Sequence, residues 1–203
     1  MEKTNLAVYG ASGHGKVVYQ IAKTLGYEEI LYIDDGENAY PNFEAFLLKY
    51  GKDMPIALGI GDNNTREKIF NHLKDSGCII QTLVDSSALI APDVRIAEGT
   101  IIMPGVIVNS QAKIGAGVIL NSACVIEHEC KIASFSHISP SVSLAGRVSV
   151  GVKTHVGIGA CVIQSICIGE NAIVGAGSVV IKDVESDSVV AGNPAKKIRE
   201  MDV

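Results

Sequence analysis

The sequence predicts an α/β N-terminal unit followed by an all-β solenoid. Two observations predict the first unit: the glycine-rich turn "GASGHG" directly follows a short apolar run, and strand-like and helix-like segments alternate as far as Gly77. One observation predicts the solenoid, namely an aliphatic residue at every sixth position from Ile90 onward. A chain of 203 residues is long enough for both units.

The first unit is predicted to contain three strands and two helices in alternation. Apolar runs indicate strands within residues 5–10, 30–35 and 55–62, and apolar stripes indicate amphipathic helices over residues 16–25 and 63–77. This order predicts a parallel sheet with its ligand at the carboxyl ends of the strands. The glycine-rich turn, two consecutive carboxylates and Gly61 all follow such ends.

The glycine-rich turn fits neither phosphate-binding template completely. A Walker A loop requires Ser or Thr where Val17 follows Lys16, and a dinucleotide fingerprint requires glycine in place of Ser12. Asp34 and Asp35 end the second strand at about the distance where a dinucleotide fold places an acid for a ribose hydroxyl. The unit is too short for two such halves, so a mononucleotide is the expected ligand. A purely structural glycine turn and a merely polar strand end remain the alternatives.

The second unit is defined by its six-residue period. Residues 90–185 divide into sixteen consecutive hexads, each of which begins with Ile, Leu or Val. This period fits neither a helix nor a simple strand, so the chain must turn a corner in each hexad with the first residue pointing inward. Three faces then close a coil of about 18 residues, and a little over five stacked coils bury an aliphatic column.

Composition narrows the class of protein. A formal net charge of -5, from 17 basic and 22 acidic residues, predicts no nucleic-acid partner. No apolar stretch is long enough to span a membrane and no signal pattern is present at the N-terminus, so we expect no membrane insertion and a cytoplasmic location. The five cysteines are expected to be free thiols. The pairs Cys124 and Cys130, and Cys161 and Cys167, are six residues apart and hence on different faces, which argues against a metal site.

Three motifs together resemble a known family. The uninterrupted hexads, the ending "VVAGNPAKKI" and the coupling to an N-terminal "YGASGHGKVV" are similar to the bacterial sugar N- and O-acetyltransferases of the PglD and NeuD type, within the hexapeptide-repeat acyltransferase superfamily. The segment "VIEHECKIASFSHIS" resembles the active-site segment of the UDP-4-amino-sugar N-acetyltransferase branch. The resemblance implies a Rossmann-like nucleotide-sugar-binding domain over residues 1–85 and a left-handed parallel β-helix over residues 86–203. It also implies acetyl-CoA as co-substrate, no metal, a UDP-linked amino sugar as acceptor, and a homotrimer.

The same resemblance assigns roles to individual residues. Acetyl transfer to an amine requires a base that works near neutral pH, and His128 lies between Glu127 and Glu129. The resemblance implies that His128 is the base and Glu129 its partner, although a histidine between acids is also compatible with a solvated pair. Contacts to the sugar nucleotide are implied for Ser12, Gly13, His14, Asp34, Asp35 and Gly61, and contacts to acetyl-CoA for His137, Gly146, Ile158 and Ala176.

Some positions carry additional expectations. Gly146 lies 18 residues beyond His128, one coil further on, where its bare N–H could donate to a thioester oxyanion. Ala176 stands where the compared family member has glycine. Lys196 and Lys197 are interpreted either as contacts to CoA phosphates or as a solvated tail. Outward residues such as Ile101, Ile107 and Ile119 are expected to meet another subunit.

Three alternatives to N-acetylation remain open at the sequence level. The first is O-acetylation of sialic acid or another surface sugar, with His128 deprotonating a hydroxyl. The second is a metal-dependent lyase that resembles the β-helix carbonic anhydrases, because His137 and His155 are 18 residues apart and should stack. The third is a sugar-nucleotide-binding protein without catalytic activity.

Overall fold

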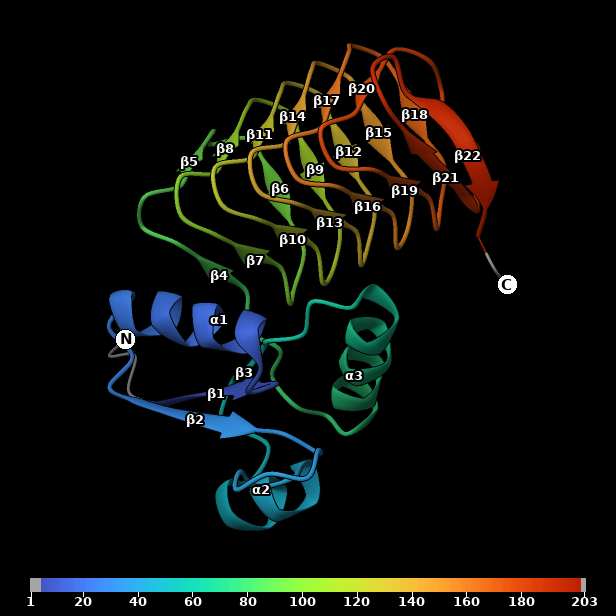
Figure 1. The fold of residues 1–203 in the computed structure, drawn as a ribbon. Coiled ribbons are helices and arrows are strands. Elements are labelled where there is room, and N and C mark those ends of the chain that lie inside the picture. Colours follow the sequence, from blue (N-terminus) through green and yellow to red (C-terminus); the bar gives the residue numbers. More distant parts are fainter. Residues whose placement is uncertain (1–4, 202–203) are drawn as a thin grey trace.

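The computed structural model describes residues 5–201 and confirms an α/β unit followed by a parallel β-solenoid (Figure 1). A three-stranded parallel sheet of order β2-β1-β3 forms the centre of the first unit. Helix α2, over the segment "FEAFLLKY", was not predicted; its N-cap Asn42 accepts a hydrogen bond from Ala45 N at 2.9 Å. The elements of this unit are β1 (Asn5–Tyr9), α1 (Gly13–Thr24), β2 (Glu29–Ile33), α2 (Phe43–Tyr50), β3 (Ile56–Leu58) and α3 (Asn63–Asp75).

Three glycines allow β1, α1 and the end of β3 to pack backbone against backbone. A Cβ atom at Gly15 would lie 1.8 Å from the Gly10 carbonyl oxygen, and one at Gly10 would lie 2.8 Å from the Gly59 oxygen. Gly10 also has φ +104°, a conformation that strains any side chain. The glycine pattern of the turn therefore has a structural cause in addition to any ligand.

The solenoid is a prism with three parallel sheets, which we call faces 1, 2 and 3, and neighbouring strands of a face are 18 residues apart. Face 1 contains β4 (Leu83–Val84), β7 (Ile101–Ile102), β10 (Ile119–Leu120), β13 (His137–Ile138), β16 (His155–Val156) and β19 (Ile173–Val174). Face 2 contains β5 (Leu89–Ile90), β8 (Ile107–Val108), β11 (Val125–Ile126), β14 (Ser143–Leu144), β17 (Cys161–Val162) and β20 (Val179–Val180). Face 3 contains β6 (Arg95–Ile96), β9 (Lys113–Ile114), β12 (Lys131–Ile132), β15 (Ser149–Val150) and β18 (Cys167–Ile168).

The hexad register is confirmed along the prism. First-position residues such as Ile102, Leu120 and Ile126 are fully buried in one continuous core. The fourth residue of a hexad takes a left-handed conformation even where it is not glycine, as at Glu129 and Arg147, with φ +61° and +62°. The solenoid begins one hexad earlier than predicted, because β4 already belongs to face 1.

The first unit covers the early part of face 1. Helix α1 lies against β4, and the outward residues Ile101 and Ile119 are buried among Leu6, Val18 and Ile21 of the first unit. The prediction that Ile101 and Ile119 meet another subunit is therefore wrong, because their own N-terminal unit covers them. Ile107 lies on face 2 and stays partly exposed.

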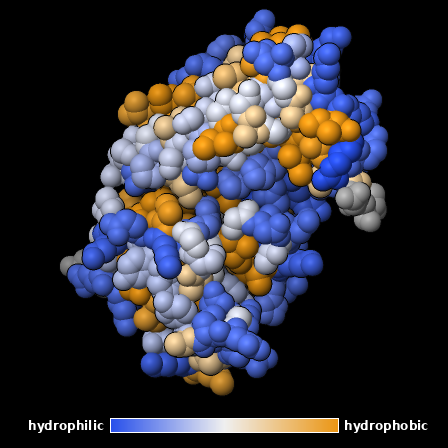
Figure 2. Space-filling model, viewed as in Figure 1, coloured by the Kyte–Doolittle hydropathy of each residue, from blue (hydrophilic) through white to orange (hydrophobic). Residues whose placement is uncertain are grey.

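The outward side chains of the other two faces differ in chemistry. Face 2 carries an apolar column interrupted by Ser143 and Cys161, and Leu89 at its start is 65% exposed. Figure 2 shows an apolar patch on the solenoid where β5 and β8 lie. On face 3, the outward residues of the first three strands are instead cationic and pair in register: Arg95, Lys113 and Lys131.

The chain ends in an antiparallel pair. Strand β21 (Ser188–Ala191) continues face 1, and β22 (Lys196–Glu200) runs back along it with all of its residues exposed. Within residues 5–201, no helix has the length and apolar character required to cross a bilayer.

Candidate active site

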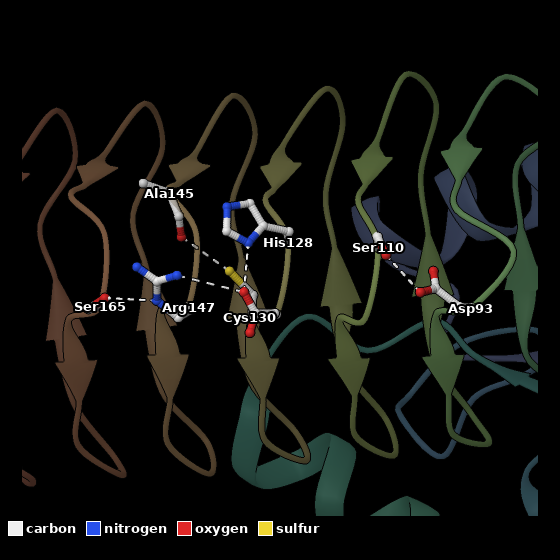
Figure 3. Close-up of polar contacts among 8 residues, drawn as sticks. Asp93, Ser110, His128, Cys130, Ala145, Arg147 and Ser165 are labelled. Carbon is white, nitrogen blue, oxygen red and sulfur yellow. Dashed lines mark hydrogen bonds and ion pairs between the residues drawn. The ribbon is translucent and has the colours of Figure 1, made fainter.

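His128 lies on the corner between faces 2 and 3, in the turn from β11 to β12 (Figure 3). Its Nδ1 is 3.0 Å from Glu129 Oε2, and both side chains are about half exposed. Because a carboxylate accepts only, Nδ1 carries a hydrogen, and in the neutral ring Nε2 then keeps its lone pair. Arg147, one coil further along the prism, approaches the same Glu129 oxygen at 3.7 Å. The corner thus holds an imidazole with a free basic nitrogen and a fixed tautomer.

Gly146 lies directly against the imidazole ring. A Cβ atom at Gly146 would be 2.5 Å from His128 Nε2 and 2.6 Å from its Cε1. The Gly146 carbonyl accepts from Ser165 N at 2.9 Å. The Gly146 N–H has no acceptor among residues 5–201, and neither has the N–H of His128, which occupies the same turn position one coil earlier. The position therefore combines space for the ring with a free backbone donor next to Nε2.

Replacement of Gly146 by alanine is expected to lower kcat/KM by about 10²-fold, because the new methyl group displaces the ring by roughly 1 Å. The melting temperature should change little, since the turn geometry accepts alanine. The matched control is Gln164→Ala, at the same turn position one coil further along the same corner. Steady-state kinetics and thermal melting of both variants test the expectation, and a Gly146→Ala variant with native kcat/KM would contradict it.

A cavity of about 370 Å³ lies at the carboxyl ends of β1 to β3. Asp34 shapes its rim: one carboxylate oxygen accepts from Ala11 N at 2.8 Å and the other from Gly36 N at 2.9 Å. These hydrogen bonds, that from Ala11 above all, lower the pKa of Asp34. Asp35 accepts from the Tyr9 hydroxyl and from Phe43 N. Four residues predicted to bind the nucleotide line this cavity: Ser12, Asp34, Asp35 and Gly61.

Gly13 and His14 are not among the residues that line this cavity, and His14 lies where the two units meet. Its ring centroid is 6.4 Å from that of His137, which in turn stacks on His155 at 4.7 Å. Asn121 Oδ1 accepts from Ser122 N, so its amide donates to His137 Nε2 at 3.0 Å and the hydrogen of His137 is on Nδ1. Burial lowers the pKa of His137 to about 3 and that of His14 to about 4. These imidazoles are neutral at physiological pH.

A second cavity, of about 420 Å³, lies between His137 and His155 of the solenoid and the first unit. Gly61 and Asp62 line both cavities, so the two cavities are neighbours. The other residues around the second cavity are Asn63, Asn64, His137, Lys153, His155, Asn171, Ile173 and Met201.

The remaining predicted residues lie on other parts of the prism. Ile158 and Ala176 are exposed on the corner between faces 1 and 2. The lyase alternative requires a third ligand beside His137 and His155, and residues 5–201 hold no group of three or more His, Cys, Asp or Glu suited to a metal. His128 lines neither of these two cavities.

Sequence reasoning missed Arg66, which is fully buried where the units meet. From α3 its guanidinium donates to the Ile60 and Gly61 carbonyls of the first unit, at 3.2 and 2.9 Å. It also donates across the boundary to Gly117 O and Phe135 O, both at 2.7 Å. Burial lowers its pKa to about 10, so it stays charged. The available signal was its place on the apolar stripe of α3, four residues before Phe70.

Comparison with known proteins gives consistent matches. Residues 5–73 match the family of the PglD N-terminal domain. A histidine-to-asparagine variant of perosamine N-acetyltransferase from Caulobacter crescentus, solved with CoA and GDP-perosamine, is 32% identical, with 97% of each chain covered and a TM-score of 0.92. The acetyltransferase domain of PglB from Neisseria gonorrhoeae, solved with acetyl coenzyme A, is 32% identical, with 97% of this chain and 100% of that chain covered and a TM-score of 0.90. WeeI from Acinetobacter baumannii is 31% identical, with 96% and 100% covered and a TM-score of 0.87.

Proposed function

The chain belongs to the PglD-like sugar N-acetyltransferases of the hexapeptide-repeat group, with their left-handed β-helix, and we propose that it transfers the acetyl group of acetyl-CoA to the amine of a nucleotide-linked sugar. The observation that carries the proposal is the corner of His128, Glu129 and Gly146. It combines an oriented base with a free backbone donor. Acetyl-CoA is the co-substrate, as in the relatives solved with it.

The corner supports each proton transfer of the reaction. The neutral amine attacks the thioester carbonyl, and His128 Nε2 accepts the proton that the amine loses. Glu129, hydrogen-bonded to Nδ1, stabilises the resulting imidazolium. The Gly146 N–H donates to the oxyanion of the tetrahedral intermediate. The intermediate collapses to the amide, and the CoA thiolate leaves and takes the proton from His128.

The acceptor is proposed to be a UDP-linked 4-amino-4,6-dideoxy sugar. The 370 Å³ cavity holds the nucleotide beside Gly10 and Ser12 of the glycine-rich turn, just before the N-terminus of α1, a position that suits a phosphate group without Mg²⁺. The choice of UDP depends on the segment "VIEHECKIASFSHIS", whereas one relative was solved with GDP-perosamine. Both nucleotides therefore belong in the test.

The assembly is proposed to be a homotrimer that packs through face 2. Leu89, Ile107, Val125 and Val179 form an apolar outward column there. When three prisms turn face 2 toward a common axis, the corner that holds His128 meets the corner of the next subunit that holds Ile158 and Ala176. This arrangement unites the positions assigned to acetyl-CoA, which one chain keeps apart. A cytoplasmic location is proposed because all five cysteines are free thiols.

The test is a panel of acceptors incubated with acetyl-CoA and analysed by mass spectrometry. It contains UDP-linked and GDP-linked 4-amino sugars, CMP-sialic acid and free sialic acid. The expected result is one added acetyl group on the UDP-linked amine, absent with the His128→Ala variant. Acetylation of the GDP-linked sugar alone would correct the nucleotide, and acetylation of sialic acid alone would favour the O-acetyltransferase alternative. No acetylation of any acceptor would overturn the proposal.

A further inference from the structure

Three cations form a ladder on face 3 that the proposed function does not yet use. Arg95, Lys113 and Lys131 occupy equivalent positions of β6, β9 and β12 and pair directly in register. All three are exposed, and none has an ion-pair partner among residues 5–201. Like charges directly opposite one another destabilise a sheet, so this ladder has an electrostatic cost that an anion would relieve.

The ladder lies in a hollow of about 420 Å³ that ends at the catalytic corner. Two carboxylates share the hollow: Asp93 accepts from the Ser110 hydroxyl, and Glu129 is bound to His128 and Arg147. Both carboxylates are thus engaged on the corner and not with the ladder. The strip keeps a net positive charge within reach of His128.

The direction of the ladder along the prism indicates its ligand. All four positions assigned to acetyl-CoA come later along the prism than His128, whereas Lys113 and Arg95 lie in earlier coils; the four are His137, Gly146, Ile158 and Ala176. The thioester therefore reaches His128 from one end, which leaves the ladder end for the acceptor. In the proposed trimer, packed through face 2, face 3 of one subunit lies across a groove from face 1 of the next, and the first unit of that subunit covers the early part of its face 1.

We propose that Arg95, Lys113 and Lys131 bind the diphosphate of the acceptor nucleotide sugar that the neighbouring subunit holds. The inference rests on the proposed N-acetyltransfer and on the trimer. Strands of a sheet are about 4.8 Å apart, so the three cations span roughly 10 Å, enough for two adjacent phosphates. Arg95 offers a fork to phosphate oxygens, and the lysines act as point charges.

The test replaces all three cations with glutamine and compares the variant with a triple control of equal net charge, Lys23→Gln, Lys52→Gln and Lys68→Gln. Those three lysines are exposed on the first unit and lie outside both cavities. Because three charge contacts to phosphate are lost together, the KM for the nucleotide sugar should rise about tenfold or more. The KM for acetyl-CoA should stay within about twofold of the wild-type value. Added salt should raise the KM for the sugar more steeply in the wild type than in the ladder variant.

A second measurement separates this proposal from the proposed function. Calorimetric titration with UDP or GDP, whichever the acceptor panel selects, should show several-fold weaker binding to the ladder variant than to the control. If the ladder variant keeps the wild-type KM for the sugar and the wild-type nucleotide affinity, only the proposed role of the ladder is overturned. If the wild-type protein has no activity, the acetyltransferase proposal is overturned. A raised KM for acetyl-CoA instead would assign the ladder to the coenzyme, and dissociation of the variant in sedimentation would assign it to assembly. Either outcome would also overturn the inference.

Discussion

Replacement of His128 by alanine is expected to lower kcat by about 10²- to 10⁴-fold while the protein melts at nearly the same temperature. The ring is half exposed, and its one polar partner among the described residues is Glu129, so its loss removes little stability. Without the imidazole, the proposed reaction loses the base that accepts the proton of the attacking amine. Steady-state kinetics at saturating substrates, with thermal melting beside them, measure both effects.

Two further variants make the His128 result specific. Glu129→Gln keeps the ring but removes the negative charge beside Nδ1, so its loss of kcat should be smaller than that of His128→Ala. His72→Ala removes an exposed histidine of α3 that contacts Phe43, and it should leave kcat unchanged. A His128→Ala protein with native kcat would instead contradict the role of His128 as the base.

Replacement of Arg66 by methionine is expected to lower the free energy of unfolding by about 3–5 kcal/mol, because each buried acceptor left without a partner costs about 1–3 kcal/mol. The guanidinium has no exposed surface and supplies donors to carbonyls of both units, so its removal leaves several buried acceptors without partners. Urea denaturation followed by circular dichroism measures the change. The loss of these hydrogen bonds should also separate the unfolding transition of the first unit from that of the solenoid.

Two companions define the role of Arg66. Arg66→Lys keeps the charge but cannot reach all of the carbonyls, so its destabilisation should be intermediate. Lys74→Met breaks an exposed ion pair between the same helix and Glu98, and it should cost less than about 1 kcal/mol. An Arg66→Met variant as stable as Lys74→Met would refute the view that buried hydrogen bonds at this boundary hold the units together.

The architecture of the solenoid could be predicted because its information is local. Each hexad turns one corner, so an aliphatic residue every sixth position is sufficient to predict the coil and which side chains point inward. His128 and Glu129 could be predicted as a pair for the same reason, since they are neighbours in one turn. Gly146 could be placed beside them because one coil has a fixed length.

Features that depend on how the two units meet could not be predicted. Ile101 and Ile119 point outward, and nothing in their spacing distinguishes another subunit from the chain's own helix α1. The neighbourhood of His14 and His137 joins residues more than 100 positions apart. Asp34 and Asp35 were predicted to contact the ligand. In the structure their oxygens also accept hydrogen bonds from the surrounding loops, and the local spacing of residues does not reveal these bonds.

The final strand has a consequence for the behaviour of the protein in concentrated solution. A stack of parallel coils exposes unpaired backbone groups at its last turn, and these can recruit the first turn of another molecule into an endless fibre. Strand β22 runs antiparallel to β21 and carries two lysines, an arginine and a glutamate. Its reversed direction and its charges oppose the addition of another molecule at this edge of face 1.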